Sequence, residues 1–190
     1  MKLAKLVTVI AKIAEICYWI GSGMTAAIVI GIIAGNTSLI SALSSVKPES
    51  GKDLAAFGFS ISTTNPAGNT VWGSYLIFFI TLLAMLLLMA MVCRNVCLIF
   101  KTTEGKTKFS KGKTPFQPAN IRMVRQIGFF LIAMPVIGLI MSVIAKAALA
   151  ASKVECSMDL HFIVIGLVVI CLARIFAYGM ELQNDVDGLV

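Results

Sequence analysis

Charged residues are scarce in this 190-residue chain: they make up 13% of the sequence, whereas hydrophobic residues make up 58%. A water-soluble domain is normally about 25% charged and about 45–50% apolar. So few polar side chains cannot cover the surface of a globule in water. The composition therefore excludes an ordinary soluble domain and favours a membrane protein, with a single domain over residues 1–190.

The residues that build common catalytic and metal sites are also sparse. His161 is the one histidine of the sequence, and no glycine-rich phosphate loop or Ser–His constellation is present. The sequence has five cysteines: Cys17, Cys93, Cys97, Cys156 and Cys171. They form neither a CxxC pair nor a Cys/His metal spacing. We therefore expect no enzyme activity, no cofactor and no bound metal ion.

The most prominent feature of the sequence is a set of four long apolar runs. A helix needs about 20 apolar residues to cross the hydrocarbon core of a bilayer. Runs of that length lie near 13–35, 71–100, 121–148 and 160–180. They predict an all-α fold, an integral membrane four-helix bundle, with a long outer loop between its first and second helices.

The basic residues predict the orientation of these spans. Twelve of the sixteen Lys and Arg residues fall before the first span, around the second connection, or near the same ends of the spans. Because basic residues are retained on the cytoplasmic side, both termini are expected in the cytoplasm. This placement puts the excess positive charge, formally +7, on the cytoplasmic side of the membrane. Anionic lipids attract positive charge there, so the charge needs no further partner to explain it. No direct nucleic-acid binding is expected.

The first outer connection contains a strand-like pattern. Phe57, Phe59 and Ile61 alternate with small or polar residues, and "NPAGN" at 65–69 has the composition of a turn. A short hairpin or lid is expected, with the second outer connection, "LAASKVECSMDL", packed against it. Such a lid either covers a ligand pocket or has no ligand, and the second interpretation is preferred.

Small residues recur every four positions in the first span, which is typical of close helix packing in membranes. The stripe comprises Gly23, Ala27, Gly31 and Gly35. Another helix of the same chain, or a second copy in a homo-oligomer, can approach the backbone there. Packing within the chain is the preferred interpretation.

Three polar residues fall inside or near the ends of the spans: Arg94, Asn95 and Arg174. A charge within a membrane is a candidate functional site, but arginine side chains near a helix end also reach out to the interface. Interfacial anchoring is preferred over a buried polar site for both arginines.

Cys93 and Cys97 are four residues apart and therefore share one helical face. Two nearby thiols raise the alternative of a membrane thiol oxidoreductase. Because both lie in apolar helix on the cytoplasmic side, ordinary packing is preferred.

The chain ends in a short acidic tail that contains Glu181, Asp185 and Asp187. In the predicted topology this tail emerges on the same side as Arg122 and Arg125, at the start of the third span. We expect at least one of these acids to contact one of the two arginines. Such a contact would form a cytoplasmic latch between the last two helices.

Two stretches carry a resemblance to a known family. They are "TPFQPANIRMVRQIGFFLI", in which Asn120 is expected to cap the third helix, and "LARIFAYGMELQNDVDGLV" at the end. Together with four spans, they resemble the YoaS-like family of small bacterial membrane proteins, which is a domain of unknown function. Its members are often encoded beside a small helix-turn-helix transcription regulator. The resemblance implies the bacterial cytoplasmic membrane and such a regulator as partner.

Three functions remain in competition. The first is a non-catalytic sensor or regulatory protein that holds the regulator at its cytoplasmic face. The second is a small transporter or a lipid- or peptide-binding membrane protein, which needs a polar path through the helices. The third is the thiol oxidoreductase. The preference follows that order.

Overall fold

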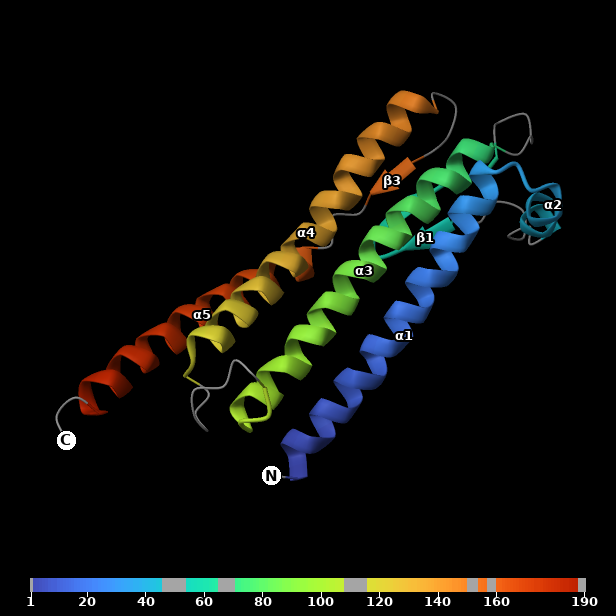
Figure 1. Ribbon diagram of the computed structural model, residues 1–190. Coiled ribbons are helices and arrows are strands. Elements are labelled where there is room, and N and C mark those ends of the chain that lie inside the picture. Colours follow the sequence, from blue (N-terminus) through green and yellow to red (C-terminus); the bar gives the residue numbers. More distant parts are fainter. Residues whose placement is uncertain are drawn as a thin grey trace. The chain divides into compact units, whose positions relative to one another are not determined.

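The computed structural model describes residues 2–45, 54–64, 71–107, 116–149, 154–156 and 160–187. These residues are mostly helical (Figure 1). The helices are α1 (Lys2–Ile33), α2 (Thr37–Ser45), α3 (Trp72–Thr103), α4 (Pro118–Ala148) and α5 (Leu160–Asp187). The strands are β1 (Leu54–Ala56), β2 (Phe59–Ile61) and β3 (Val154–Cys156).

Within the described residues, four helices are long and apolar enough to cross a membrane. These candidate spans are Lys5–Ile33, Trp72–Thr103, Pro118–Ala148 and Leu160–Val186. They confirm the prediction of four long apolar helices, at approximately the predicted positions. The first helix starts earlier than predicted, at Lys2, because no glycine or proline interrupts the residues that precede the apolar run.

Gly35 ends α1 and does not serve helix packing. Its φ of +66° places it in the left-handed region. The amide of Gly35 donates to the carbonyl of Ile32, and the amide of Asn36 donates to the carbonyl of Gly31. This is the hydrogen-bond pattern with which glycine closes many helices. The side chain of Asn36 then accepts from the amide of Ser38 at 3.1 Å and caps α2, a helix that the sequence did not predict.

The start of α4 differs from the prediction. The helix begins at Pro118, and the amide of Ile121 donates to the carbonyl of Gln117 at 3.1 Å. Proline suits the first helical position because its missing N–H would have no partner in the helix. Asn120 is therefore not the cap. It lies in the first turn and donates from Nδ2 to Oγ1 of Thr103, on α3, at 3.2 Å.

A three-stranded antiparallel sheet accompanies the helices, with β2 between β1 and β3. Leu54 pairs with Ile61 across the hairpin, and the turn at Phe57 and Gly58 has positive φ at both residues, 50° and 77°. Such a turn matches the twist of the two strands. The strand-like pattern is confirmed at Phe59 and Ile61 but not at Phe57, which lies in the turn, and the predicted turn at 65–69 lies outside the described residues. The all-α expectation missed the sheet because each strand has only three residues.

The second outer connection packs against the hairpin, as predicted, and does so as a strand, β3, which was not predicted. Phe59 pairs with Cys156, and Ile61 pairs with Val154. Two segments far apart in the sequence therefore share one sheet.

Contacts divide the chain into two compact units. Unit 1 comprises Met1–Tyr18, Leu88–Ala133 and His161–Val190; unit 2 comprises Trp19–Leu87 and Met134–Leu160. The core of unit 2 joins the sheet to α3 and α4. Its buried members are Phe59, Ile61, Ile77, Phe78, Met85, Ala145 and Val154. The rings of Phe59 and Phe78 stack with centroids 6.5 Å apart.

Unit 1 contains a close crossing of α4 and α5. A Cβ atom added at Gly128 would lie 2.8 Å from the carbonyl oxygen of Gly166, and one added at Gly166 would lie 2.8 Å from the carbonyl oxygen of Gly128. Only glycine permits backbones to approach so closely. This pair fixes α4 against α5.

The predicted small-residue stripe of α1 is not used for packing within the chain at Gly23 or Ala27, and its use by a second copy stays a prediction. Gly23 has no atom within 4 Å of an added Cβ, and Ala27 is exposed. Instead Gly21 contacts Leu86 of α3, and Thr25 and Val29 are buried. Because two residues correspond to about 200° of helix rotation, the row through Gly21 points almost opposite to the row through Gly23.

Candidate functional site

A carboxylate is buried within the first candidate span. Glu15 lies in unit 1, and its side chain is only 9% exposed. Nζ of Lys12, one turn earlier in α1, donates to Oε2 of Glu15 at 2.9 Å. The side chain of Lys12 is 49% exposed. The Lys12 ammonium therefore pairs with a buried carboxylate while half of the lysine side chain stays exposed.

Two thiols of α3 lie near this ion pair. Glu15 is close enough to interact electrostatically with both Cys93 and Cys97. Cys97 is buried, and its Sγ donates to the carbonyl oxygen of Thr8, on α1, at 3.7 Å. We call Thr8, Lys12, Glu15, Cys93 and Cys97 the α1–α3 polar cluster. It joins a charge pair to thiols between two helices.

Side-chain amides extend the polar contacts between helices. Asn95 of α3 is buried, and its Nδ2 donates to Oε1 of Gln126, on α4, at 3.4 Å. Asn120 and Thr103 make the second contact between the same helices. These contacts place the end of α3 against the start of α4. Of the three predicted intramembrane polar residues, Asn95 is thus the one buried within the chain.

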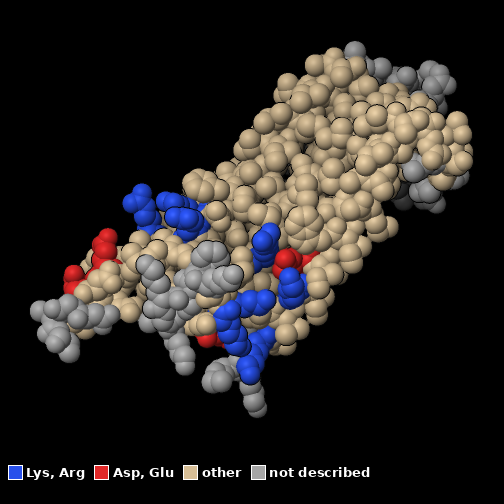
Figure 2. All heavy atoms as spheres, viewed as in Figure 1, with Lys and Arg blue, Asp and Glu red and all other residues tan. Residues whose placement is uncertain are grey.

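Arg94 and Arg174 are exposed, and so are Arg122 and Arg125. Figure 2 shows several Lys and Arg side chains gathered over one part of the visible face. None of the four arginines forms an ion pair with a described residue. Exposure leaves the side chains of Arg94 and Arg174 able to reach a membrane interface, and their interfacial anchoring stays a prediction.

The ionic latch is not formed between the described side chains. Glu181 and Asp185 are exposed, and neither pairs with Arg122 or Arg125 among the ion pairs of the described residues. The side chain of Asp187 lies outside the described residues.

An apolar contact joins the same two segments instead. The ring of Phe116, just before α4, lies against Phe176 of α5, with centroids 5.7 Å apart. An added Cβ at Gly179 would lie 2.7 Å from the Phe116 ring. We call Phe116, Phe176 and Gly179 the aromatic clasp. It unites the two stretches that carry the family resemblance, and Glu181 and Asp185 follow it along α5 as exposed residues.

Just after α3, Glu104 forms an exposed ion pair with Lys106. The hydrogen bond from Lys106, and then its charge, hold the pKa of the Glu104 carboxyl below its usual value of 4.5. Both residues lie in the basic connection and outside the candidate span. This pair is a local feature of the turn at Gly105, which has a φ of +77°.

Glu15 was not predicted as a site residue. The signal was available: "IAEICYWIGSG" places one carboxylate inside an apolar run, where a charge needs a partner.

Within the described ranges, no group of three or more His, Cys, Asp or Glu side chains is placed to hold a metal ion. Cys17, Cys93, Cys97 and Cys171 are free thiols. The chemistry of the α1–α3 polar cluster is therefore that of a carboxylate, an ammonium and two unlinked thiols.

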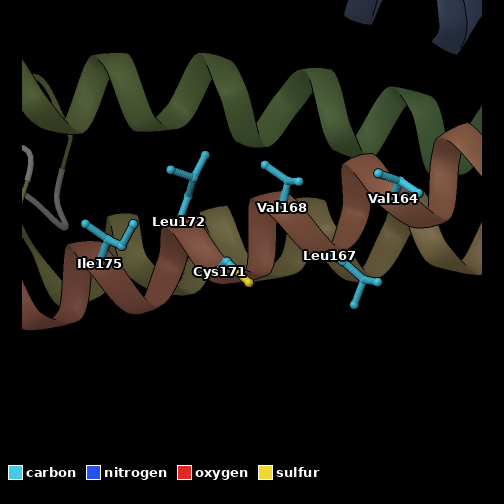
Figure 3. Close-up of a pocket in the computed structure, with 6 residues that line it drawn as sticks. All are labelled: Val164, Leu167, Val168, Cys171, Leu172 and Ile175. Carbon is cyan, nitrogen blue, oxygen red and sulfur yellow. The ribbon is translucent and has the colours of Figure 1, made fainter.

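An open apolar groove runs along α5 (Figure 3). It has a volume of about 360 Å³ and is lined by Val164, Leu167, Val168, Cys171, Leu172 and Ile175. In Figure 3 Val168 and Leu172 project to one side and Leu167 projects to the other. The lining has no polar surface.

Comparison with known proteins gives no relative from which to carry over a function. The chain matches no protein-family model, no curated protein and no solved structure. Membership of the YoaS-like family stays a prediction from the two sequence stretches.

Proposed function

We propose that this chain is a non-catalytic, multi-pass protein of the bacterial cytoplasmic membrane that regulates a soluble partner. Both termini lie in the cytoplasm, where the basic start of α4 and the end of α5 form the partner-binding face. Four helices long and apolar enough to cross a membrane support the location. The twelve-to-four distribution of Lys and Arg supports the orientation.

The observation that supports a regulatory role is that the aromatic clasp fixes the start of α4, where two arginines have no acidic partner among the described residues. Phe116 holds the start of α4 to α5, while Arg122 and Arg125 remain exposed and unpaired with described acids. A fixed surface with free guanidinium groups suits an acidic protein partner, because arginine binds carboxylates in bidentate pairs.

The identity of the partner is proposed from the family resemblance alone. It is a small helix-turn-helix transcription regulator that the membrane protein holds until a signal arrives. In this proposal the regulator, and not the membrane protein, binds DNA.

The test is recovery of the partner from native membranes. The tagged chain is cross-linked in cells, extracted in mild detergent, and the co-purified proteins are identified by mass spectrometry. We expect a helix-turn-helix regulator with the natural chain and its loss when Arg122 and Arg125 are both replaced by Glu. Lys146→Glu, at the exposed last turn of α4, is the control and should retain the partner. Retention by the arginine variant would contradict the proposed face.

A second candidate function, a small transporter, is favoured by Glu15. An ionisable residue buried in a candidate span commonly marks a substrate or proton path. Glu15→Gln should abolish proton-coupled uptake by vesicles if the chain is a transporter, while partner recovery should persist. If Glu15→Gln changes neither, the ion pair is structural.

A further inference from the structure

The apolar groove on α5 has the dimensions of one lipid chain. Its lining residues recur at the spacing of one helical face, from Val164 to Ile175. Eleven residues of helix rise roughly 16 Å, about half of the ~30 Å hydrocarbon core. The groove therefore has the length of a single leaflet.

A positive charge stands at one end of this groove. Arg174 follows Leu167 and Cys171 at helical spacings of seven and three residues, so it continues the same face. The side chain is exposed and forms no ion pair with a described residue. A long arginine side chain can extend from an apolar face to the level of the headgroups.

The arginines of α4 lie at the same level along α5. The crossing places Gly128 between Gly166 and Ile170, and the clasp places Phe116 beside Phe176. The two helices are therefore antiparallel here. Arg125, one turn before Gly128, falls near the level of Cys171, and Arg122 falls near the level of Arg174. The end of the groove thus lies at the level of three arginines, none of which forms an ion pair with Glu181 or Asp185.

We propose that the α5 groove binds an anionic phospholipid, with one acyl chain along Val164–Ile175 and its phosphate on the guanidinium of Arg174. An apolar chain fits a lining without polar surface, and a phosphate fits the two-pronged guanidinium. Basic pockets beside membrane helices bind anionic headgroups in the same way. This site rests on membrane insertion and not on the regulatory partner.

The test measures lipid preference directly. The purified, delipidated chain in detergent is mixed with equal amounts of dioleoyl phosphatidylglycerol and dioleoyl phosphatidylcholine, and bound lipid is counted by native mass spectrometry. We expect phosphatidylglycerol to be retained at least fivefold over phosphatidylcholine. Arg174→Gln should remove that preference, and Arg174→Lys should keep part of it. Equal retention of the two lipids by the natural chain would overturn the proposal.

Two further variants separate the headgroup from the groove. Val168→Trp fills the groove without changing charge, and it should lower phosphatidylglycerol retention about fivefold. Lys146→Gln removes an exposed charge from α4 in unit 2 and should leave retention unchanged. Unchanged retention by Val168→Trp would overturn the acyl-chain assignment. Because Arg174→Gln leaves Arg122 and Arg125 intact, loss of lipid preference with partner recovery preserved would distinguish this site from the proposed regulatory face.

Discussion

Unit 1 and unit 2 bury polar groups of different kinds. The described polar side chains buried in unit 2 are all hydroxyls: Ser22, Thr25, Thr63, Ser74, Thr81 and Ser142. Four of them donate to a carbonyl of their own helix, three or four residues earlier. A hydroxyl whose hydrogen bond is made within its own helix does not help to select the neighbouring helix.

The described part of unit 1 buries the carboxylate of Glu15 and the amides of Asn95, Gln117 and Asn120, together with one hydroxyl, that of Thr102. Asn95 bonds to Gln126 and Asn120 bonds to Thr103, in both cases from one helix to another. Glu15 pairs with Lys12, three residues earlier in its own helix. Unit 2 is thus stabilised mainly by apolar packing around the sheet, whereas in unit 1 amide hydrogen bonds join α3 to α4.

The largest effect is expected in the apolar core of unit 2. Phe59 is 1% exposed and packs between the sheet and α3. Phe59→Ala should lower the free energy of unfolding by about 3–5 kcal/mol, because it removes buried surface and leaves a cavity. Phe129, 57% exposed, is the control, and Phe129→Ala should have a much smaller effect. Unfolding in mixed micelles, followed by circular dichroism, measures both; equal losses would contradict the assigned core.

The next effect concerns the glycine crossing in unit 1. Gly128→Ala should destabilise by about 1–3 kcal/mol, because the new methyl group meets the backbone of α5. Gly23→Ala should instead be neutral or stabilise by up to about 1 kcal/mol, since alanine favours helix and the position is open. The same unfolding measurement distinguishes these opposite signs. Destabilisation by Gly23→Ala would restore the predicted packing stripe.

A smaller loss is expected when the buried ion pair is broken. Lys12→Gln leaves the Glu15 carboxylate buried without its cation and should cost about 1–2 kcal/mol, since the lysine is half exposed. Adding Glu15→Gln should recover most of that loss. Lys5, exposed on the same helix, supplies the control variant Lys5→Gln. Additive losses in this double-mutant cycle would show that the two groups do not interact.

The smallest effect compares one polar contact from each unit. Asn95→Ala should cost about 0.6 kcal/mol, the average for a hydrogen bond between membrane helices. Thr81→Val in unit 2 should cost less, because the hydroxyl bonds only to Ile77 of its own helix. Unfolding free energies of the two variants test the order. A larger loss for Thr81→Val would reverse the comparison.

The positions of the four long helices could be predicted because length and apolar composition are properties of each segment alone. The strand at Phe59–Ile61 was also visible in local alternation. The packing faces could not be predicted in this way. Whether α1 packs through Gly21 or Gly23 depends on how that helix is rotated against its neighbour. The same holds for the pairing of Gly128 with Gly166.

The candidate site followed the same rule. The proximity of the α5 ending to the α4 start was expected, but the contact uses Phe116 and Gly179 in place of the described acids. A surface acid gains little from a pair in water, whereas an aromatic ring gains by covering apolar surface. The charge pattern therefore predicted which two segments lie close together, but not that their contact would be apolar.

The three-stranded sheet imposes an order on assembly of the chain. The hairpin of β1 and β2 is local and belongs to a class of motif that forms within microseconds. By contrast, Ser60 Oγ donates to the carbonyl of Glu155, a residue 95 positions later, at 3.2 Å. That contact cannot exist until α3 and α4 have been synthesised, and its large sequence separation makes its formation slow. The pairing of β3 with β2 is thus the late step that completes the core formed by the hairpin, α3 and α4.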